Sequence, residues 1–307
     1  MPSDRPTVRA YYCDHFVLPL PDGHRFPMEK YRLLRERFAD SSDVALLVPE
    51  AVTNEELGRV HTSGYLEAVV SGDLEREEVR RIGFPWSLEL VERSRRSAGG
   101  TLAASRAALT DGASANLAGG THHAFADRGE GFCVFNDVAV AIRAHQAERT
   151  AERFGVLDLD VHQGNGTARI FTGDPSVFTC SVHGRNNYPF RKEVSDLDLE
   201  LEDGADDDSF LAAVATGLDR VLASDPDLIF FVAGADPFQG DKLGRLGVSK
   251  AALAVRDETV FSHCAQHGVP VAVVMSGGYA ESVSDTVDIH EVTVRTAARH
   301  AKPGNFA

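Results

Sequence analysis

The sequence predicts an α/β protein in which a single parallel sheet is covered by helices on both faces. From about Ala115 onward, short apolar runs alternate with segments of helical periodicity, and no hairpin signature separates the runs. Strands joined through helical crossovers lie parallel, and burial on both faces makes them apolar throughout. No Pro- or Ser-rich linker, internal repeat or low-complexity tract divides the 307 residues. We therefore expect one domain over residues 1–307.

Local periodicity and capping residues predict the individual elements. In the first part of the chain we expect a strand at Val8–Tyr12, a helix at Met28–Ala39, a short helix started by the capping box Thr53–Glu56, a helix at Gly64–Val70, and a long helix at Ser87–Leu109 that is interrupted or tightly packed at Gly99-Gly100. In the second part we expect strands at Ala115–Leu117, Val156–Val161, Val177–Val182, Leu228–Val232 and Val269–Met275, with helices at Asp137–Glu148 (capped by Asn136), at Phe210–Ala223, and from Ser249 to Gly268.

Composition excludes several classes of protein. No apolar run approaches the roughly 18 residues of a membrane span, and Met1–Asp14 has no apolar signal-peptide core, so we expect a soluble, cytoplasmic protein. The net charge of −15 disfavours a nucleic-acid partner. The four cysteines are far apart, which favours free thiols in a reducing compartment. Cys133 is a weak candidate for a nucleophile, because a metal site explains the nearby histidines better.

One segment is compositionally unusual. Glu193–Asp208 holds nine acidic residues, with leucines at 197, 199 and 201 alternating among them. We expect an edge strand followed by a loop, with Asp206–Asp208 at the N-terminus of the next helix. The alternative is a calcium site or a site for a substrate tail.

The stretch Val156–Gly166 organises the chain. Side chains alternate along a strand, so Asp158, Asp160 and His162 project to one side while the leucines and valine between them project to the other. A half-exposed strand would explain this pattern, but a sheet covered on both faces would take two carboxylates and an imidazole out of water. Such a group needs a strong partner, and a divalent metal supplies one.

Four loops that leave strand ends carry suitable residues, and ligands of parallel sheets gather at those ends. The loops are Gly119–His123, Asp158–Gly166, Gly234–Asp236 and Ser276–Tyr279. Together they predict Asp160, His162 and Asp236 as metal ligands with an open coordination position. From the same loops, His122 and His123 are candidates for acid–base work, Tyr279 for oxyanion stabilisation, and Asp158 for orienting His122.

These residues carry a resemblance to a known family. The matching stretches are Gly119–His123, Asp127–Cys133, Asp158–Gly166, Ala233–Asp236, Gly240–Gly244 and Ser276–Tyr279. The chain resembles zinc-dependent histone deacetylases of the arginase/deacetylase superfamily from about Met28 to the C-terminus. That resemblance implies a sheet of eight parallel strands and a hydrolase that removes acyl groups from Nε-acyl-lysine. It also implies one Zn²⁺ bound by Asp160, His162 and Asp236.

The resemblance further assigns roles to individual residues. His123 would be the main base and acid, His122 its electrostatic partner, and Tyr279 the group that polarises the carbonyl. Phe132, Tyr188 and Gly131 would line the substrate tunnel. A structural K⁺ would be held by Asp158, Ser181 and main-chain carbonyls of Asp160, His162 and Val182.

Two departures from the commonest family pattern make the chain most similar to class IV. Gln163 stands where many members have a histidine, and Asn165 where many have an aspartate. Asn165 would give His123 a neutral partner, and losing a negative neighbour lowers an imidazole pKa. Class IV similarity also raises the expectation of long-chain acyl groups, which the human member prefers.

Three other functions compete with this reading. A two-metal ureohydrolase needs a carboxylate two residues beyond the metal-binding histidine, where this chain has Gly164. A non-catalytic acyl-lysine reader has no need of Tyr279 together with both histidines. Deacetylation of acetylated polyamines or other small amides uses the same chemistry, and the sequence hardly separates it from protein deacylation.

Overall fold

The computed structural model describes residues 8–302 and contains one eight-stranded sheet. Part of the N-terminal segment Met1–Asp14, including the charged residues Asp4 and Arg5, lies outside the described residues. Every pair of neighbouring strands is parallel, in the order β2-β1-β3-β8-β7-β4-β5-β6. The strands are β1 (Val8–Tyr11), β2 (Val44–Leu47), β3 (Ala113–Asn116), β4 (Phe154–Asp158), β5 (Val177–Gly184), β6 (Leu197–Leu201), β7 (Leu228–Val232) and β8 (Val271–Val274).

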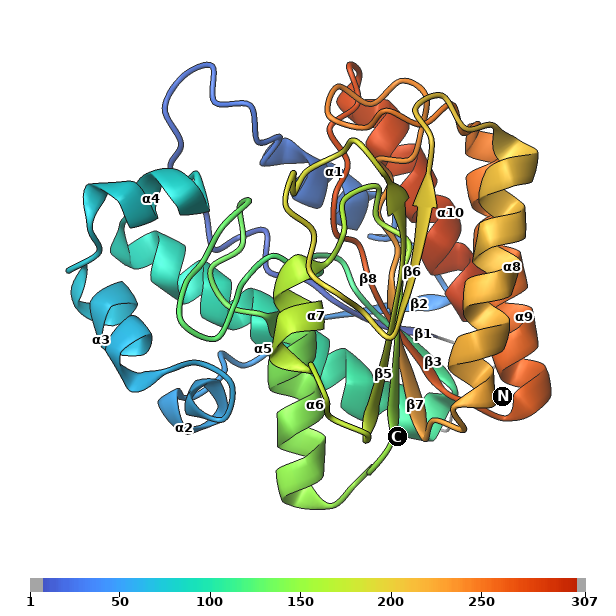
Figure 1. Cartoon of the computed structure of the whole chain (residues 1–307), viewed down its shortest axis with the longest axis horizontal. Helices are drawn as coiled ribbons and strands as arrows, with labels where there is room; N and C mark the ends of the chain where they lie inside the picture. Colours follow the sequence, from blue (N-terminus) through green and yellow to red (C-terminus); the bar gives the residue numbers. More distant parts are fainter. Residues whose placement is uncertain (1–7, 303–307) are drawn as a thin grey trace.

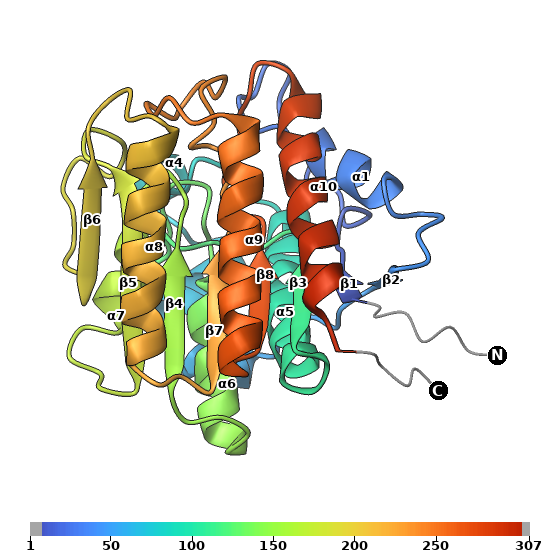
Figure 2. The same cartoon turned by 90° about the vertical axis from the view of Figure 1, so that its right-hand side faces the viewer.

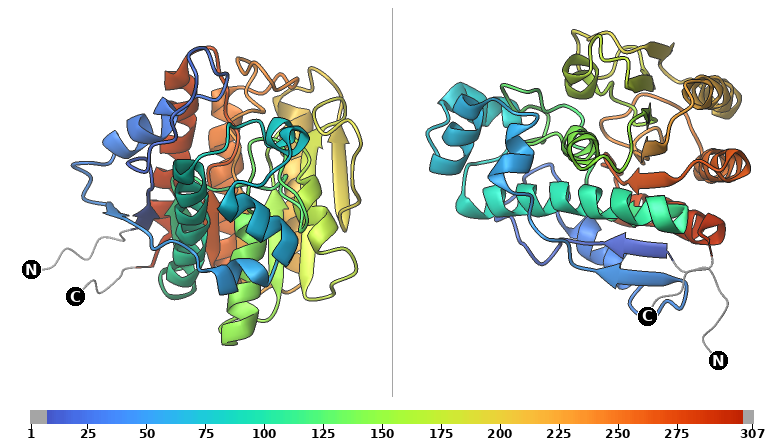
Figure 3. Two further views of the ribbon diagram at one scale, coloured as in Figure 1. Left: turned by 90° about the vertical axis from the view of Figure 1, so that its left-hand side faces the viewer. Right: turned by 90° about the horizontal axis from the view of Figure 1, so that it is seen from below.

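Helices cover both faces of the sheet, as predicted (Figure 1). Figure 2 shows α8 (Asp207–Ala223), α9 (Lys250–His267) and α10 (Val283–His300) side by side over one face, with α1 (Glu29–Glu36) beside α10. The opposite face is covered by α5 (Leu88–Asp111) and α6 (Asp137–Glu148), and outside them lie α2 (Asn54–Gly58), α3 (Ser63–Ser71) and α4 (Arg76–Ile82) (Figure 3). The short helix α7 (Asn165–Ile170) follows β4 in the chain.

Burial explains this arrangement. The central strands β4 and β7 are buried at every position, so each needs a helical layer on both sides. One hydrophobic cluster joins alternate strand residues such as Leu157 and Phe231 to α8, α9 and α10, and a second joins Val156 and Phe230 to α5 and α6. None of the helices among residues 8–302 is long and apolar enough to cross a membrane.

Local signals in the sequence were confirmed at several positions. The Thr53 capping box starts α2, and the side chains of Asn136 and Ser249 cap α6 and α9. At Gly99 the long helix α5 is unbroken but tightly packed, because a Cβ there would lie 1.8 Å from the carbonyl oxygen of Glu50.

The acidic segment has the predicted structural role. Its leucines form the edge strand β6, and Asp206 caps α8 through its side chain. Asp198 accepts a hydrogen bond from Gln163 Nε2 at 2.8 Å, which ties the segment to the loop after β4. Within residues 8–302, no metal-binding cluster occurs in this segment.

Two expectations about element boundaries were wrong. The organising strand β4 ends at Asp158, so Asp160 and His162 lie beyond the strand, in the loop before α7. The predicted helix Met28–Ala39 is the shorter α1. Four further elements were not predicted from the sequence: β2, α4, α7 and α10.

The sheet order explains why four distant loops meet. The strands β3, β8, β7 and β4 are consecutive neighbours at the centre of the sheet, although they are far apart in the chain. Because all four are parallel, their carboxyl ends lie at the same edge. The loops that follow them are the four that the sequence singled out.

Candidate metal and catalytic site

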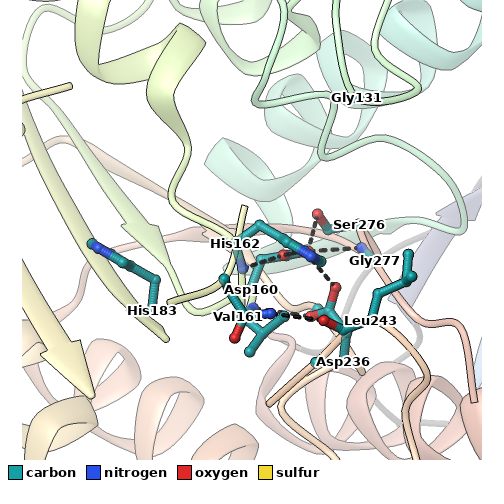
Figure 4. A network of polar contacts seen from close by, with 12 residues as sticks. Gly131, Asp160, Val161, His162, His183, Asp236, Leu243, Ser276 and Gly277 are labelled. Atoms are coloured by element: carbon teal, nitrogen blue, oxygen red, sulfur yellow. Dashed lines mark hydrogen bonds and ion pairs between the residues drawn. The ribbon is translucent and has the colours of Figure 1, made fainter. Parts of the chain in front are cut away.

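Asp160, His162 and Asp236 converge at this edge, as predicted for metal ligands (Figure 4). His162 Nδ1 lies 3.0 Å from Asp160 Oδ1 and 3.1 Å from Asp236 Oδ2, and all three residues are buried. Ligand atoms about 2.0–2.1 Å from a tetrahedral ion lie roughly 3.3 Å apart. The donor set and its spacing therefore fit one divalent metal ion.

The second oxygen of each carboxylate is anchored by the protein. Asp160 Oδ2 accepts hydrogen bonds from Ser276 Oγ and from the Gly277 amide, both at 2.8 Å, and Asp236 Oδ1 accepts one from the Val161 amide at 3.0 Å. Asp236 Oδ2, although buried, forms no hydrogen bond of acceptable geometry among the described residues, and its 3.1 Å contact with His162 Nδ1 joins two candidate ligand atoms. A buried carboxylate oxygen without a hydrogen bond is costly, and a metal ion would satisfy it.

The electrostatics of the cluster also favour a cation. Burial, followed by the neighbouring Asp160 carboxylate, raises the pKa of Asp236 to about 7. Burial alone would lower the pKa of His162, but its contacts with the two carboxylates raise it to about 10. Two carboxylates thus stabilise a positive charge at this point, which is the electrostatic requirement of a metal site.

Each of the paired histidines has its own partner. His122 Nδ1 lies 2.7 Å from Asp158 Oδ2, and His123 Nδ1 lies 2.7 Å from Asn165 Oδ1; both pairings were predicted. Burial opposes protonation of His122, but Asp158 and Asp160 raise its pKa to about 9. Burial, then the nearby His122 and His162, hold the pKa of His123 well below its ordinary value. These shifts favour a charged His122 ring next to a neutral His123 ring at neutral pH.

Glu130 fixes the orientation of the Asn165 amide. Asn165 Nδ2 donates to Glu130 Oε1 at 2.7 Å, and Tyr188 Oη donates to the same oxygen at 2.8 Å. The amide therefore turns Oδ1 toward His123, where it accepts the proton on Nδ1 and leaves Nε2 free to act as a base. The sequence does not predict a role for Glu130, because its two partners, Asn165 and Tyr188, are 35 and 58 residues away in the chain.

Tyr279 lies on a loop held from two sides. Its amide donates to Asp241 Oδ2 at 2.6 Å, and Lys30 Nζ donates to the carbonyls of Ser276 at 3.1 Å and Gly278 at 3.4 Å. Burial raises the pKa of Tyr279 well above its ordinary value, so the hydroxyl keeps its proton.

Lys30 is a second residue next to the site to which the sequence analysis assigns no role. It is buried, Nζ lies 5.3 Å from the centre of the Tyr279 ring, and burial lowers the pKa of Lys30 to about 8. A signal was present, because Lys30 and Leu34 are four residues apart and share the buried face of α1.

A cavity of about 540 Å³ leads to the site. The predicted tunnel residues line it: the Phe132 ring lies 6.1 Å from that of Tyr279, and the Tyr188 ring 4.9 Å from that of His123. Gly131 needs to be a glycine here, because it has φ +58° and a Cβ would lie 2.6 Å from His123 Cδ2. A larger residue would strain the backbone and fill the tunnel.

Two of the residues expected at a structural K⁺ site lie on neighbouring strands. Asp158 and Ser181 are paired in register between β4 and β5, and the Asp160 amide donates to Asp158 Oδ1 at 3.2 Å. Ser181 Oγ lies 2.9 Å from Nδ1 of His183, whose side chain is apart from the metal ligands in Figure 4.

Comparison with known proteins agrees with this geometry. A family model described as "Histone deacetylase domain" matches residues 24–294. A protein of Picosynechococcus sp. described as uncharacterized is 43% identical and covers 93% of this chain and 97% of its own. Histone deacetylase 2 of Arabidopsis thaliana is 30% identical (80% and 67%), and the acetoin utilization protein AcuC of Bacillus subtilis is 33% identical (80% and 70%).

Solved structures share the fold. The crystal structure of a histone deacetylase homologue complexed with SAHA has a TM-score of 0.79 at 22% identity, covering 96% of this chain and 85% of its own. Sheet, site and family model together define a protein of the arginase/deacetylase-like fold. The chain belongs to the histone deacetylase family.

Proposed function

We propose that this protein is a zinc-dependent hydrolase of the class IV type that removes acetyl or longer acyl groups from Nε-acyl-lysine. The observation that carries the proposal is that Asp160 and His162, two of the three clustered candidate metal ligands, line one cavity together with His123 and Tyr279. A metal site alone could be structural, but structural sites are closed by a fourth protein ligand. Here the three candidate ligands have no fourth protein ligand among the described residues, and the neutral His123 and the protonated Tyr279 line the cavity that leads to them.

The chemistry follows from the positions of these groups. A Zn²⁺ held by Asp160, His162 and Asp236 would polarise the substrate carbonyl and lower the pKa of a water molecule. His123 would take the proton of that water on Nε2 and pass it to the leaving amine. The Tyr279 hydroxyl would donate a hydrogen bond to the oxyanion as charge develops on it.

Neighbouring groups support these steps. The charged His122 would stabilise negative charge in the transition state, and Asp158 would hold its ring in place. Phe132 and Tyr188 would enclose the lysine stem and exclude water. A K⁺ beside Asp158 and Ser181, coordinated also by carbonyls of Asp160, His162 and Val182, would fix the loop that carries the ligands. Gln163 and Asn165 support the class IV assignment.

Turnover of a panel of substrates tests the function. Lysine peptides bearing acetyl to myristoyl groups are incubated with metal-loaded protein beside acetylated polyamines, and release of the free amine is measured. We expect hydrolysis of at least one acyl-lysine peptide. Faster turnover of the polyamines than of any peptide would select the small-amide alternative. Binding of peptides without turnover would identify a non-catalytic reader.

Asn165 and Glu130 together predict a pH effect. In Asn165→Asp, the new carboxylate replaces an amide nitrogen that lies 2.7 Å from Glu130 Oε1. Two carboxylates at that distance retain a proton between them, so His123 gains little negative charge. In the double variant Asn165→Asp/Glu130→Gln, the glutamine amide can donate to an ionised aspartate beside His123. The pKa of His123 is then expected to rise, because a negative neighbour favours the charged imidazole.

Because neutral His123 is the base, a higher pKa moves the acid limb of kcat/KM to higher pH. Activity at slightly acidic pH is then lost, while alkaline activity is retained. The measurement is a set of pH–rate profiles on one acyl-lysine peptide, with Glu130→Gln as the control for the second substitution. If the limb of the double variant coincides with that of the control, Asn165 serves only the glycine turn between Gly164 and Gly166.

A further inference from the structure

The charged residues around the mouth of the cavity have the opposite sign to the protein as a whole. The chain carries 46 acidic and 31 basic residues, for a net charge of −15. Among the described residues that line the cavity, however, the charged side chains other than histidines are one aspartate, the metal ligand Asp160 at its base, and four arginines. These four, the mouth arginines, are Arg25, Arg80, Arg81 and Arg245.

The mouth arginines come from separate parts of the chain. Arg25 lies between β1 and α1, Arg80 and Arg81 lie in α4, and Arg245 lies between β7 and α9. All four residues nevertheless line the same cavity. All four are exposed, and they lie on three separate segments around one opening.

Contacts place two of these residues at the tunnel itself. Arg25 Cζ lies 5.1 Å from the centre of the Phe132 ring, which forms one wall of the tunnel. The carbonyl of Arg81 accepts a hydrogen bond at 3.0 Å from the amide of Gly131, which lines the cavity next to His123. The Arg25 guanidinium therefore lies against the wall of the cavity, and the main-chain contact places Arg81 next to Gly131 at the same opening.

Three of the four mouth arginines form no ion pair within the described residues. Within residues 8–302, ion pairs neutralise many surface arginines, as Glu36 does for Arg32 at 2.8 Å. Arg245 pairs with Asp203 at 3.3 Å. No described carboxylate lies within 4.0 Å of the guanidinium nitrogens of the other three mouth arginines. Like charges held together repel one another, and an anionic ligand would relieve that repulsion.

We propose that the mouth arginines select acyl-lysines flanked by acidic residues and reject cationic substrates such as acylated polyamines. This inference rests on the proposed function and names its substrate class. Guanidinium groups pair with carboxylates in bidentate geometry, and the same groups repel ammonium groups, so one feature supplies both attraction and exclusion. A peptide advances about 3.3–3.6 Å per residue, so side chains within two or three residues of the acyl-lysine can reach the mouth.

Three matched peptides test the proposal. Each contains a central acyl-lysine with the acyl group that the protein hydrolyses best, flanked on both sides by Glu, Gln or Lys. We expect kcat/KM of the metal-loaded protein to fall in the order Glu, Gln, Lys, by about tenfold at each step at low ionic strength. The differences should shrink as salt is added, because exposed charges are screened. N-acetylspermidine should be turned over more slowly than the Glu peptide.

A variant pair connects the preference to the mouth. Arg80→Gln/Arg81→Gln removes two charges from the mouth, and Arg32→Gln/Arg299→Gln removes two charges from exposed ion pairs on α1 and α10. The first variant should lose most of the preference for Glu over Lys peptides while keeping its rate on the Gln peptide. The second should behave as the unaltered protein. Binding of the peptides to metal-loaded Tyr279→Phe protein should rank in the same order.

The outcomes separate this proposal from the proposed function. Equal rates on the three peptides, or a preference that survives Arg80→Gln/Arg81→Gln, would overturn the charge selection and leave lysine deacylation standing. A faster rate on N-acetylspermidine than on the Glu peptide would overturn it as well. If metal-loaded protein hydrolyses no acyl-lysine of any chain length, the proposed function fails and this inference fails with it.

Discussion

Removal of the metal is expected to abolish amide hydrolysis, and Zn²⁺ or Co²⁺ to restore it. The reason is electrostatic, because Asp160 and Asp236 are buried beside each other and one oxygen of Asp236 forms no hydrogen bond of acceptable geometry among the described residues. Without an ion, burial and Asp160 raise the pKa of Asp236 to about 7, so Asp236 takes up a proton near neutral pH. The metal-free protein is therefore expected to lose both its Lewis acid and the fixed geometry of the ligands.

The experiment compares activity and metal content after dialysis against a chelator. Asp236→Asn is the informative variant, since it keeps the size of the side chain and removes one ligand charge. We expect this variant to be folded, metal-poor and inactive. Full activity in protein shown to be free of metal would end the zinc proposal. Two ions per chain, by metal analysis, would support the ureohydrolase alternative instead.

Much of the fold could be predicted because short-range signals decide it. Fully apolar runs such as Leu228–Val232 became buried strands, and the caps at Asn136 and Ser249 start the helices they were expected to start. The helix α10 was not predicted from the sequence. Its buried face contains polar residues, including Thr286, His290 and Thr293, which interrupt the apolar periodicity of a helix. Burial of such groups is a tertiary property that local sequence does not reveal.

Some residues of the candidate site could be predicted from the sequence, and others could not. Asp160 and His162 could be recognised because they follow a buried strand, although the strand ends sooner than alternation suggested. Glu130 and Lys30 could not be assigned a role, because their functions consist of contacts with Asn165 and with the loop before Tyr279, which are distant in the chain. The pairing of Asn165 with a buried carboxylate also gives a reason for an amide at this position, since an aspartate there would face Glu130.

The last prediction concerns the hydroxyl group of Tyr279. The substitution Tyr279→Phe should lower kcat by about a hundredfold or more while changing KM little, because the lost hydrogen bond forms only as charge develops on the oxyanion. Burial keeps this hydroxyl protonated, so it is a donor over the whole working pH range. The aromatic ring remains, and with it the contacts to Phe26 and Phe132 that shape the cavity.

A matched control is available in Tyr65, whose hydroxyl donates to the Val134 carbonyl at 2.8 Å and does not line the cavity. Tyr65→Phe removes the same atom from a buried tyrosine, and we expect it to cost about 1 kcal/mol of stability and to leave kcat unchanged. Steady-state kinetics, thermal unfolding and metal analysis of both variants decide the matter. If Tyr279→Phe raises KM with kcat unchanged, the residue only shapes the tunnel, and the oxyanion must be stabilised by other groups.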